Sequence, residues 1–277
     1  GGRHIEVPRG KMLGGSSSIN GMVFVRGQAQ DYDHWAQLGN RGWSYQDVLP
    51  LFKKMESYEG GTEEFRGRDG PLKVTETPGG GRFFDAMIAA AERIGVKFNK
   101  DYNGDGQDGI GMSQVTINKG RRQSTAYCYL DDARKRPNLT VETGAMAQFL
   151  VLEGKVCKGV RYQLGGQDRE AHAGTEVIVC GGSINSPKLL ELSGIGRPDA
   201  LEPHDIEVIH ELPGVGEGLR DHYSPRVKFS ITEKNVTFND NARGWRLVRE
   251  VLKYAVSRTG FLATTSVPIR MYFRTRE

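Results

Sequence analysis

The segment best suited to ligand chemistry is PRGKMLGGSSSINGMVFVRG, residues 8–27, which we call the Gly/Ser loop. Because Gly14 and Gly15 carry no Cβ, a ligand can come close to the backbone N–H groups beside them. Hydroxyl and N–H groups together suit phosphate oxygens, Lys11 adds positive charge, and the Asn20 amide offers a donor and an acceptor to a heterocycle edge. A surface turn without a ligand is the alternative. A P-loop is excluded because no Gly-Lys-Ser/Thr follows the second glycine.

A second candidate is VIVCGGSINSPKLLELSGIG, residues 177–196. A run of β-branched residues at 175–180, typical of a strand buried in a parallel sheet, leads into two glycines and then a helix-like run. Doubly wound folds place ligands at such strand ends, and a helix N-terminus attracts anions. We expect Ser186 to be the N-cap and Pro187 the first helical residue. An ordinary strand–helix crossover is the alternative.

The third candidate is the glycine turn at residues 212–222, which ends in Asp221 and His222. Adjacent side chains rarely converge on one substrate, so we interpret these two as structural residues and not as a catalytic pair. The other histidines show neither HxxxH nor HExxH spacing, and no GxSxG elbow is present. We therefore assign no catalytic residue and no metal ligand.

The composition excludes several classes of function. The 277 residues, 37% of them apolar, suffice for one large domain or two modest ones. The net charge of +4, from 38 basic and 34 acidic residues, is small and scattered, so we expect no nucleic-acid partner. No apolar run approaches the ~20 residues of a membrane-spanning helix. The acidic loop 101–111 lacks the EF-hand pattern, which argues against calcium.

The cysteines indicate the redox setting. Cys128, Cys157 and Cys180 are odd in number and show no CxxC spacing, which argues against a disulfide framework and against zinc. We therefore expect a reducing, cytoplasmic setting, with a peripheral position at the inner membrane as a second option.

Local signals predict a mixed chain of the α/β class, α+β overall. Ser44, with Asp47 three residues later, forms a capping-box pattern before a helix that Pro50 can bend or break. Gly95 stands at the position of a helix stop. The predicted helices cover residues 31–38, 43–57, 82–95, 124–136, 186–192 and 244–257, and the predicted strands cover residues 138–143, 146–154, 155–164 and 175–180.

Together these segments resemble the glucose–methanol–choline (GMC) family of flavin oxidoreductases, and most closely its choline-dehydrogenase-like bacterial FAD alcohol dehydrogenases. The resemblance covers nearly the whole chain, and two long signatures in the same order make it specific. The first signature is matched by Gly10, Lys11, Leu13, Gly14, Gly15, Ser16, Ser17, Ile19, Asn20, Phe24, Gly27 and Asp33. The second is matched by Gly182, Ser183, Ser186, Pro187, Leu189, Leu190, Ser193, Gly194, Ile195 and Gly196. In the turn that follows, Gly218 stands where the family usually has Asn.

The resemblance implies that the Gly/Ser loop lies along FAD. The residues expected near the ribityl chain and the pyrophosphate are Gly14, Gly15, Ser16 and Ser17. Those expected near the isoalloxazine ring are Asn20, Gly21, Met22 and Val23. Lys11 and Leu13 complete this part of the cofactor-binding set. In the second half of the chain, backbone groups of Ala147 would lie beside the adenine, and Gly181 and Gly182 would approach the dinucleotide at the edge of a sheet.

The resemblance also implies an incomplete FAD-binding Rossmann-like domain and a substrate domain of antiparallel sheet with helices. We assign residues 1–49 and 119–222 to the FAD domain, and residues 50–118 and 223–277 to a truncated substrate domain. The family's GxGxxG unit would precede Gly1, and its catalytic His region would follow Glu277. We therefore expect an internal fragment that is inactive alone and binds FAD weakly.

Some family members attach FAD covalently through a His just before the Asn. Ile19 occupies that position here and has no nucleophilic atom, so we predict non-covalent FAD. The implied reaction is oxidation of a CH–OH group, of a choline-like or other primary alcohol, with hydride transfer to the flavin and reoxidation by a quinone, another acceptor or O₂. The alternatives are a same-fold FAD lyase of the hydroxynitrile-lyase type, a non-catalytic flavin-binding module and a plain structural domain.

Overall fold

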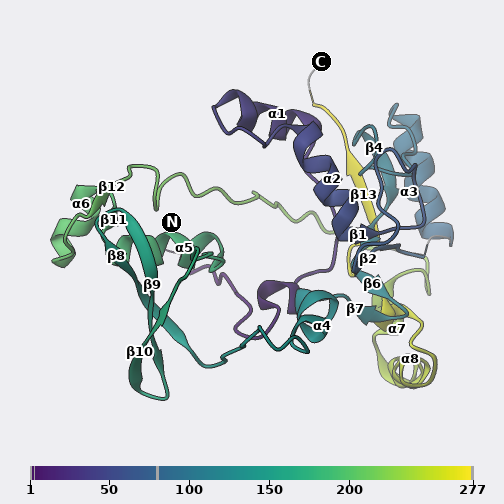
Figure 1. The fold of residues 1–277 in the computed structure, drawn as a ribbon. Helices are drawn as coiled ribbons and strands as arrows, with labels where there is room; N and C mark the ends of the chain where they lie inside the picture. Colours follow the sequence, from purple (N-terminus) through teal and green to yellow (C-terminus); the bar gives the residue numbers. More distant parts are fainter. Residues whose placement is uncertain (1, 3, 79–80, 276–277) are drawn as a thin grey trace. The chain divides into compact units, whose positions relative to one another are not determined.

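The computed structural model describes residue 2 and residues 4–78 and 81–275. The chain divides into two compact parts (Figure 1). We call Gly1–Leu139 together with Ser230–Glu277 the composite unit, and Thr140–Phe229 the inserted unit. Both contain helices and strands, so the predicted mixed class is confirmed. The division into FAD and substrate domains proposed from the sequence stays a prediction.

The helices of the composite unit begin at local sequence signals. α1 spans Ala29–Gln37 and α2 spans Tyr45–Met55. At the start of α2 the Asp47 N–H donates to Ser44 Oγ at 3.3 Å and the Ser44 N–H donates to Asp47 Oδ2 at 3.1 Å, which confirms the capping box. The helix continues through Pro50, because proline removes only one intrahelical hydrogen bond and the first turn is well capped.

Two longer helices agree with their predicted ranges, and one predicted helix is divided. α3 spans Arg82–Arg93 and is followed by Gly95 with a φ of +84°, the expected stop. α8 spans Gly244–Ser257, as predicted. The range 124–136 splits into a π-helical turn and a short α-helix. The shorter helical segments of the chain are α4 (Asp131–Ala133), α6 (Pro198–Leu201), α7 (Phe238–Asn241), the π-helical turn Ala126–Leu130, and the 3₁₀ turns Gly15–Ser18, Glu202–His204 and Phe261–Ala263.

Short strand pairs connect distant parts of the composite unit. The pairs are β1 (Glu56–Ser57) with β2 (Leu72–Lys73), β3 (Thr75–Glu76) with β5 (Gln114–Val115), β6 (Ile117–Asn118) with β7 (Arg121–Arg122), and β4 (Gly109–Met112) with β13 (Ile269–Tyr272). The first pair is parallel and the others are antiparallel. The segment 101–111, expected to be a loop throughout, becomes a strand at Gly109 because Ile110 is buried and pairs with Met271.

The end of the Gly/Ser loop joins the apolar core of this unit. The Phe24 N–H donates to Gln114 O at 2.8 Å, and Val23 forms a bridge with Val115 on β5. The core cluster contains Phe24, Tyr58, Leu72 and Val74. The loop is therefore anchored at one end by buried apolar contacts.

The inserted unit is built on a three-stranded antiparallel sheet in the order β10–β9–β8 (Figure 1). Its strands are β8 (Met146–Glu153), β9 (Val156–Leu164) and β10 (Gln167–His172). Gly154, with a φ of +56°, makes the predicted hairpin turn between β8 and β9. The polar sequence QDREAH gave no strand signal for β10. α5 (Gly182–Leu192) packs against β8, and β11 (Ile195–Gly196) pairs in parallel with β12 (His210–Glu211).

Two predicted strands are wrong. Residues 138–143 and 175–180 form no strand, because no described segment pairs with either of them. Ile178 is 75% exposed, so the second segment is not the buried strand of a parallel sheet that we expected. Among the described residues, no helix has both the length and the apolar character needed to cross a bilayer.

The predicted start of α5 is also wrong. The helix begins at Gly182, whose φ of +85° makes the turn into it. Ser186 therefore lies inside the helix and is not its N-cap, and Pro187 is an interior residue and not the first one. The two glycines make the turn five residues earlier than the Ser-Pro signal suggested, because Gly181 is the N-cap in place of Ser186 and Gly182 is the first helical residue in place of Pro187.

Candidate functional site

The Gly/Ser loop folds back on itself through close backbone contacts. Gly14 and Gly15 have φ values of +84° and +53°, a region that glycine adopts without a Cβ clash. A Cβ on Gly10 would lie 2.2 Å from the Gly15 oxygen. A Cβ on Gly15 would meet no atom within 4 Å. The loop thus needs glycine at position 10 for its own fold, and presents Gly15 to open space.

The three consecutive serine hydroxyls bind the loop's own backbone. Ser16 Oγ accepts a hydrogen bond from the Gly10 N–H at 3.2 Å, and Ser18 Oγ donates to Leu13 O at 2.9 Å. Ser17 Oγ donates to the carbonyl three residues earlier. These hydroxyls therefore shape the loop, and the ligand contacts predicted for Ser16 and Ser17 stay predictions.

Two residues that sequence reasoning did not assign to the site, Arg122 and Thr125, hold the loop from outside. Arg122 Nη1 donates to Ser17 O at 3.1 Å, to Asn20 O at 2.8 Å and to Asn20 Oδ1 at 2.7 Å. The Thr125 N–H donates to Ser17 Oγ at 3.0 Å. The only sequence signal was that the family resemblance covers nearly the whole chain and therefore includes residues 120–125.

The stretch predicted to lie near a flavin ring, residues 20–23, is fixed in place and open on one side. Met22 has a φ of +62°, which is uncommon without glycine, and its N–H donates to Asn20 Oδ1 at 3.0 Å. Thr265 Oγ1 donates to Gly21 O at 2.9 Å. A Cβ on Gly21 would meet no atom within 4 Å, so a planar ligand can approach the backbone there.

The inserted unit contains an open cavity of about 1110 Å³. Ala147 and Gly181, both predicted to contact FAD, line this cavity together with Gln148. Gln148 Nε2 donates to Asp168 Oδ1 at 3.2 Å, but its buried Oε1 has no partner among the described residues. A buried acceptor without a partner suits a ligand that donates a hydrogen bond, such as an adenine amino group.

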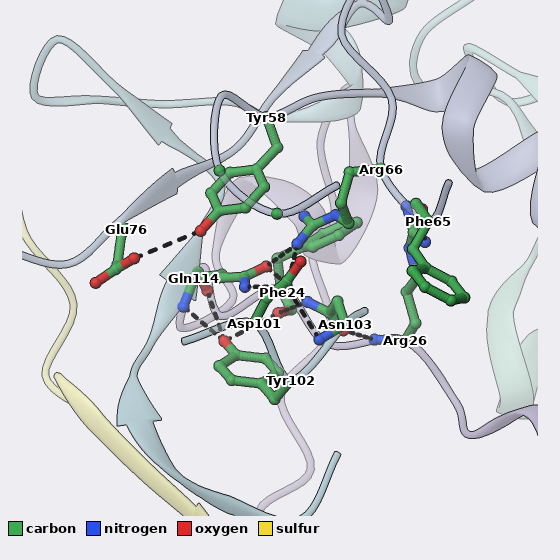
Figure 2. Close-up of polar contacts among 12 residues, drawn as sticks. Phe24, Arg26, Tyr58, Phe65, Arg66, Glu76, Asp101, Tyr102, Asn103 and Gln114 are labelled. Carbon is green, nitrogen blue, oxygen red and sulfur yellow. Dashed lines mark hydrogen bonds and ion pairs between the residues drawn. The ribbon is translucent and has the colours of Figure 1, made fainter. Parts of the chain in front are cut away.

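Arg66 is the centre of a buried polar network in the composite unit (Figure 2). Its Nε donates to Glu56 Oε1 at 2.8 Å and its Nη2 donates to Glu56 Oε2 at 3.1 Å. Arg66 Nη1 donates to Asp101 Oδ1 at 2.5 Å and to Gln114 Oε1 at 2.8 Å. Arg26 Nη2 lies 2.6 Å from Glu56 Oε1, without the alignment of a hydrogen bond. Two guanidinium groups thus face two carboxylates, which balances the buried charge.

This network anchors the last residues of the Gly/Ser loop (Figure 2). Asn103 Oδ1 accepts the Arg26 N–H at 2.7 Å, and Asn103 Nδ2 donates to Phe24 O at 3.1 Å. Tyr102 Oη accepts the Gln114 N–H at 2.5 Å and donates to Phe24 O at 3.2 Å. The acidic loop therefore supports the Gly/Ser loop, and the described residues contain no cluster of side chains arranged to hold a metal ion.

The buried tyrosine predicts a loss of stability at alkaline pH. Burial raises the pKa of Tyr102 from 10.0 to about 12. Its contribution to stability is therefore complete below pH 10 and is lost as the pH rises through about 12. We expect the titration of Tyr102 to lower the free energy of unfolding by about 3 kcal/mol over this range, in addition to the loss from Tyr58, whose pKa burial also raises. Urea unfolding followed by tryptophan fluorescence measures it, because Trp35, Trp43 and Trp245 all lie in the composite unit.

The variant Tyr102→Phe should lose this part of the pH dependence. Tyr223→Phe is the matched control, because Tyr223 is 93% exposed in the inserted unit. An equally steep fall in Tyr102→Phe and in the unmodified chain would show that Tyr102 is not the group responsible.

The comparison with protein family models decides which family the chain belongs to. The model of the GMC oxidoreductase family matches residues 1–224, which include the Gly/Ser loop and the second signature. The chain belongs to the GMC oxidoreductase family. The resemblance inferred from the sequence is thereby confirmed.

Curated GMC relatives are similar over most of this chain. An oxygen-dependent choline dehydrogenase of Brucella anthropi is 48% identical over 233 residues, which cover 84% of this chain and 42% of the relative. An oxygen-dependent choline dehydrogenase of Brucella ovis is 43% identical over 276 residues, which cover 100% of this chain and 50% of the relative. The chain spans about half the length of these relatives.

Solved GMC structures share the fold. An FAD-dependent oxidoreductase from Chaetomium thermophilum superimposes with a TM-score of 0.84 at 26% identity, covering 96% of this chain and 49% of that one. Formate oxidase of Aspergillus oryzae RIB40, in a structure concerned with FAD modification, gives a TM-score of 0.82 at 26% identity, covering 94% and 47%. Pyridoxine 4-oxidase from Mesorbium loti gives 0.69 at 30% identity, covering 74% and 41%.

In each unit taken by itself, the predicted residues fit part of FAD, the cofactor that the family and its FAD-dependent neighbours support. A Cβ on Gly15, Gly21 or Gly182 would meet nothing within 4 Å, so each leaves its backbone accessible. In the inserted unit, Gln148, whose buried Oε1 has no partner among the described residues, lines a cavity together with Ala147 and Gly181.

Proposed function

We propose that this chain is part of an FAD-dependent oxidoreductase that acts on the CH–OH group of an alcohol. The observation that carries the proposal is the family match over residues 1–224, which contains a Gly/Ser loop with accessible backbone at Gly15 and Gly21. The sequence identity of 43–48% to choline dehydrogenases supports a choline-like or other primary alcohol as substrate. The same relatives favour an oxidoreductase over the lyase alternative.

FAD, when bound, supplies the acceptor for the hydride that leaves the alcohol carbon. The residues of this chain would bind and orient it. The Gly/Ser loop offers backbone N–H groups and the Asn20 amide, and the inserted unit offers the backbone of Ala147 and the acceptor of Gln148. Lys11 is exposed and contributes positive charge near the loop.

We propose that FAD is held without a covalent bond to the loop. Ile19, just before Asn20, is 44% exposed, and its side chain consists only of carbon and hydrogen. The name of the curated relatives supports O₂ as the electron acceptor, with a quinone or another acceptor as the alternative. Three free cysteines support a reducing, cytoplasmic location.

We assign no base to the described residues. His222 is exposed, and its contact with Asp221 is a bond from its own backbone N–H to that carboxylate at 2.8 Å. Proton abstraction from an alcohol needs a positioned side chain of suitable pKa. We therefore expect the pure 277-residue chain to show no alcohol-dependent reduction of a dye.

The test of cofactor binding is the titration of FAD fluorescence with the chain, and acid precipitation of the mixture tests the mode of attachment. Because we expect weak binding, we expect quenching at high protein concentration, and we expect flavin to move to the supernatant on precipitation. Flavin that stays in the pellet would contradict non-covalent binding. No quenching of FAD fluorescence at any protein concentration would contradict the proposed cofactor, and dye reduction with choline would contradict the inactivity expected for this chain.

A further inference from the structure

One guanidinium nitrogen of Arg122 connects both ends of a short stretch of the Gly/Ser loop. It donates to the backbone oxygens of Ser17 and Asn20 and to Asn20 Oδ1, at 3.1, 2.8 and 2.7 Å. Arg122 itself belongs to β7 and pairs with Ile117 of β6. This stretch, residues 17–20, is therefore tied to β7 through a single side chain.

This contact fixes the orientation of the Asn20 amide. A guanidinium group only donates hydrogen bonds, so the Asn20 atom that faces it must be the oxygen. The same Oδ1 accepts the Met22 N–H at 3.0 Å, which is a second donor. Asn20 Nδ2 is left without an acceptor among the described residues, on an exposed side chain.

We infer that Arg122 is a positioning residue that makes Asn20 a hydrogen-bond donor toward the bound flavin. The inference rests on the proposed function, because it assumes that the Gly/Ser loop binds FAD. The ligand group that Asn20 meets must then be an acceptor, such as a ring carbonyl or an unprotonated ring nitrogen. A ligand group that donates a hydrogen bond would face the two Nδ2 hydrogens of Asn20 at that place and would have no acceptor.

The neighbouring Arg121 provides a matched control. It is exposed, its guanidinium carbon lies 5.7 Å from the centre of the Tyr127 ring, and among the described residues its side chain makes no hydrogen bond or ion pair with the loop. Arg121→Gln and Arg122→Gln therefore remove the same charge from adjacent positions of one strand. Only the second variant releases the Asn20 amide.

The first measurement is amide hydrogen exchange of the chain without FAD. In Arg122→Gln we expect the Met22 amide to exchange roughly tenfold faster, because the acceptor Asn20 Oδ1 is no longer held. The β8–β9 amides serve as the internal reference and should not change. Arg121→Gln should exchange like the unmodified chain. An unchanged Met22 amide in both Arg122→Gln and Arg122→Lys would overturn the positioning role.

The second measurement is FAD affinity by fluorescence quenching, with Asn20→Asp as the decisive variant. A carboxylate keeps both acceptor contacts, to Arg122 and to the Met22 N–H, but lacks the Nδ2 donor. We expect the Met22 amide to stay protected while FAD affinity falls roughly tenfold. Equal FAD affinity of Asn20→Asp and the unmodified chain would overturn the donor role. If the unmodified chain binds no FAD, the proposed function fails and the donor role with it, whereas the exchange result still decides the positioning role.

Discussion

Arg66→Met is expected to lower the free energy of unfolding of the composite unit by about 3 to 5 kcal/mol. The Arg66 and Glu56 side chains are both 0% exposed, and the substitution removes the paired contacts at 2.8 and 3.1 Å between them. Asp101 and Gln114 lose a donor at the same time. Arg26 still lies 2.6 Å from Glu56, which places the expected loss toward the lower end of the range.

Urea unfolding followed by tryptophan fluorescence measures this effect in the composite unit, where all three tryptophans lie. Arg93→Met, on the exposed side of α3, is the matched control and should change stability by less than ~0.5 kcal/mol. The double variant Glu56→Gln with Arg66→Met should lose less free energy of unfolding than the two single variants lose together, because both substitutions remove the same ion pair. A loss below about 1 kcal/mol for Arg66→Met would contradict the view that this pair is a buried support of the loop.

Gly10→Ala is expected to weaken FAD binding by roughly a hundredfold or more, a loss of about 3 kcal/mol. The new Cβ would lie 2.2 Å from the Gly15 oxygen, 2.4 Å from the Gly15 carbonyl carbon and 2.8 Å from the Ser16 nitrogen. All three are backbone atoms, so no side-chain rotation relieves the contact. The loop must open, and its accessible N–H groups are then displaced.

Titration of FAD fluorescence measures this loss of affinity. Two further glycine variants distinguish an effect of the distorted loop from an effect of a methyl group that occupies the ligand space. Gly106→Ala adds a Cβ to open space outside the proposed site and should bind FAD like the unmodified chain. Gly21→Ala also adds a Cβ to open space, so stability should be unchanged, but FAD affinity should fall because the proposed ligand occupies that space. Retention of full affinity by Gly10→Ala would show that the fold of the loop does not control the cofactor.

The features that the sequence predicted correctly depend on neighbours along the chain. The capping box at Ser44 needs only Asp47, the stop at Gly95 needs only its own left-handed conformation, and the β8–β9 hairpin needs one turn at Gly154. The failures depend on distant partners. Residues 175–180 have the composition of a buried strand, but strand formation requires a neighbouring strand, and no described segment supplies one.

The same distinction applies to the candidate site. Gly14, Gly15 and Asn20 were predicted because their types and spacing fit a signature within a single segment. The residues that hold the loop in place were not predicted, because their partners are distant in sequence. Arg122 lies 102 residues from Asn20, and Arg66 lies 48 residues from Gln114. The sequence of a short basic run does not indicate whether an arginine is solvated or donates hydrogen bonds to three carbonyl and amide oxygens. Only the folded chain distinguishes Arg122 from Arg121.

The order in which the chain is synthesised has a consequence for the cofactor loop. Gly21 O is held by Thr265, and β4 pairs with β13, in which Met271 lies opposite Ile110. The inserted unit has its own internal sheet, formed from residues close in sequence, and can fold while the later residues are still on the ribosome. The composite unit must wait until residue 272 has emerged. The Gly/Ser loop is therefore translated well before the residues that lock it, so we expect flavin capture to wait until residue 272 has been made and not to accompany synthesis of the loop.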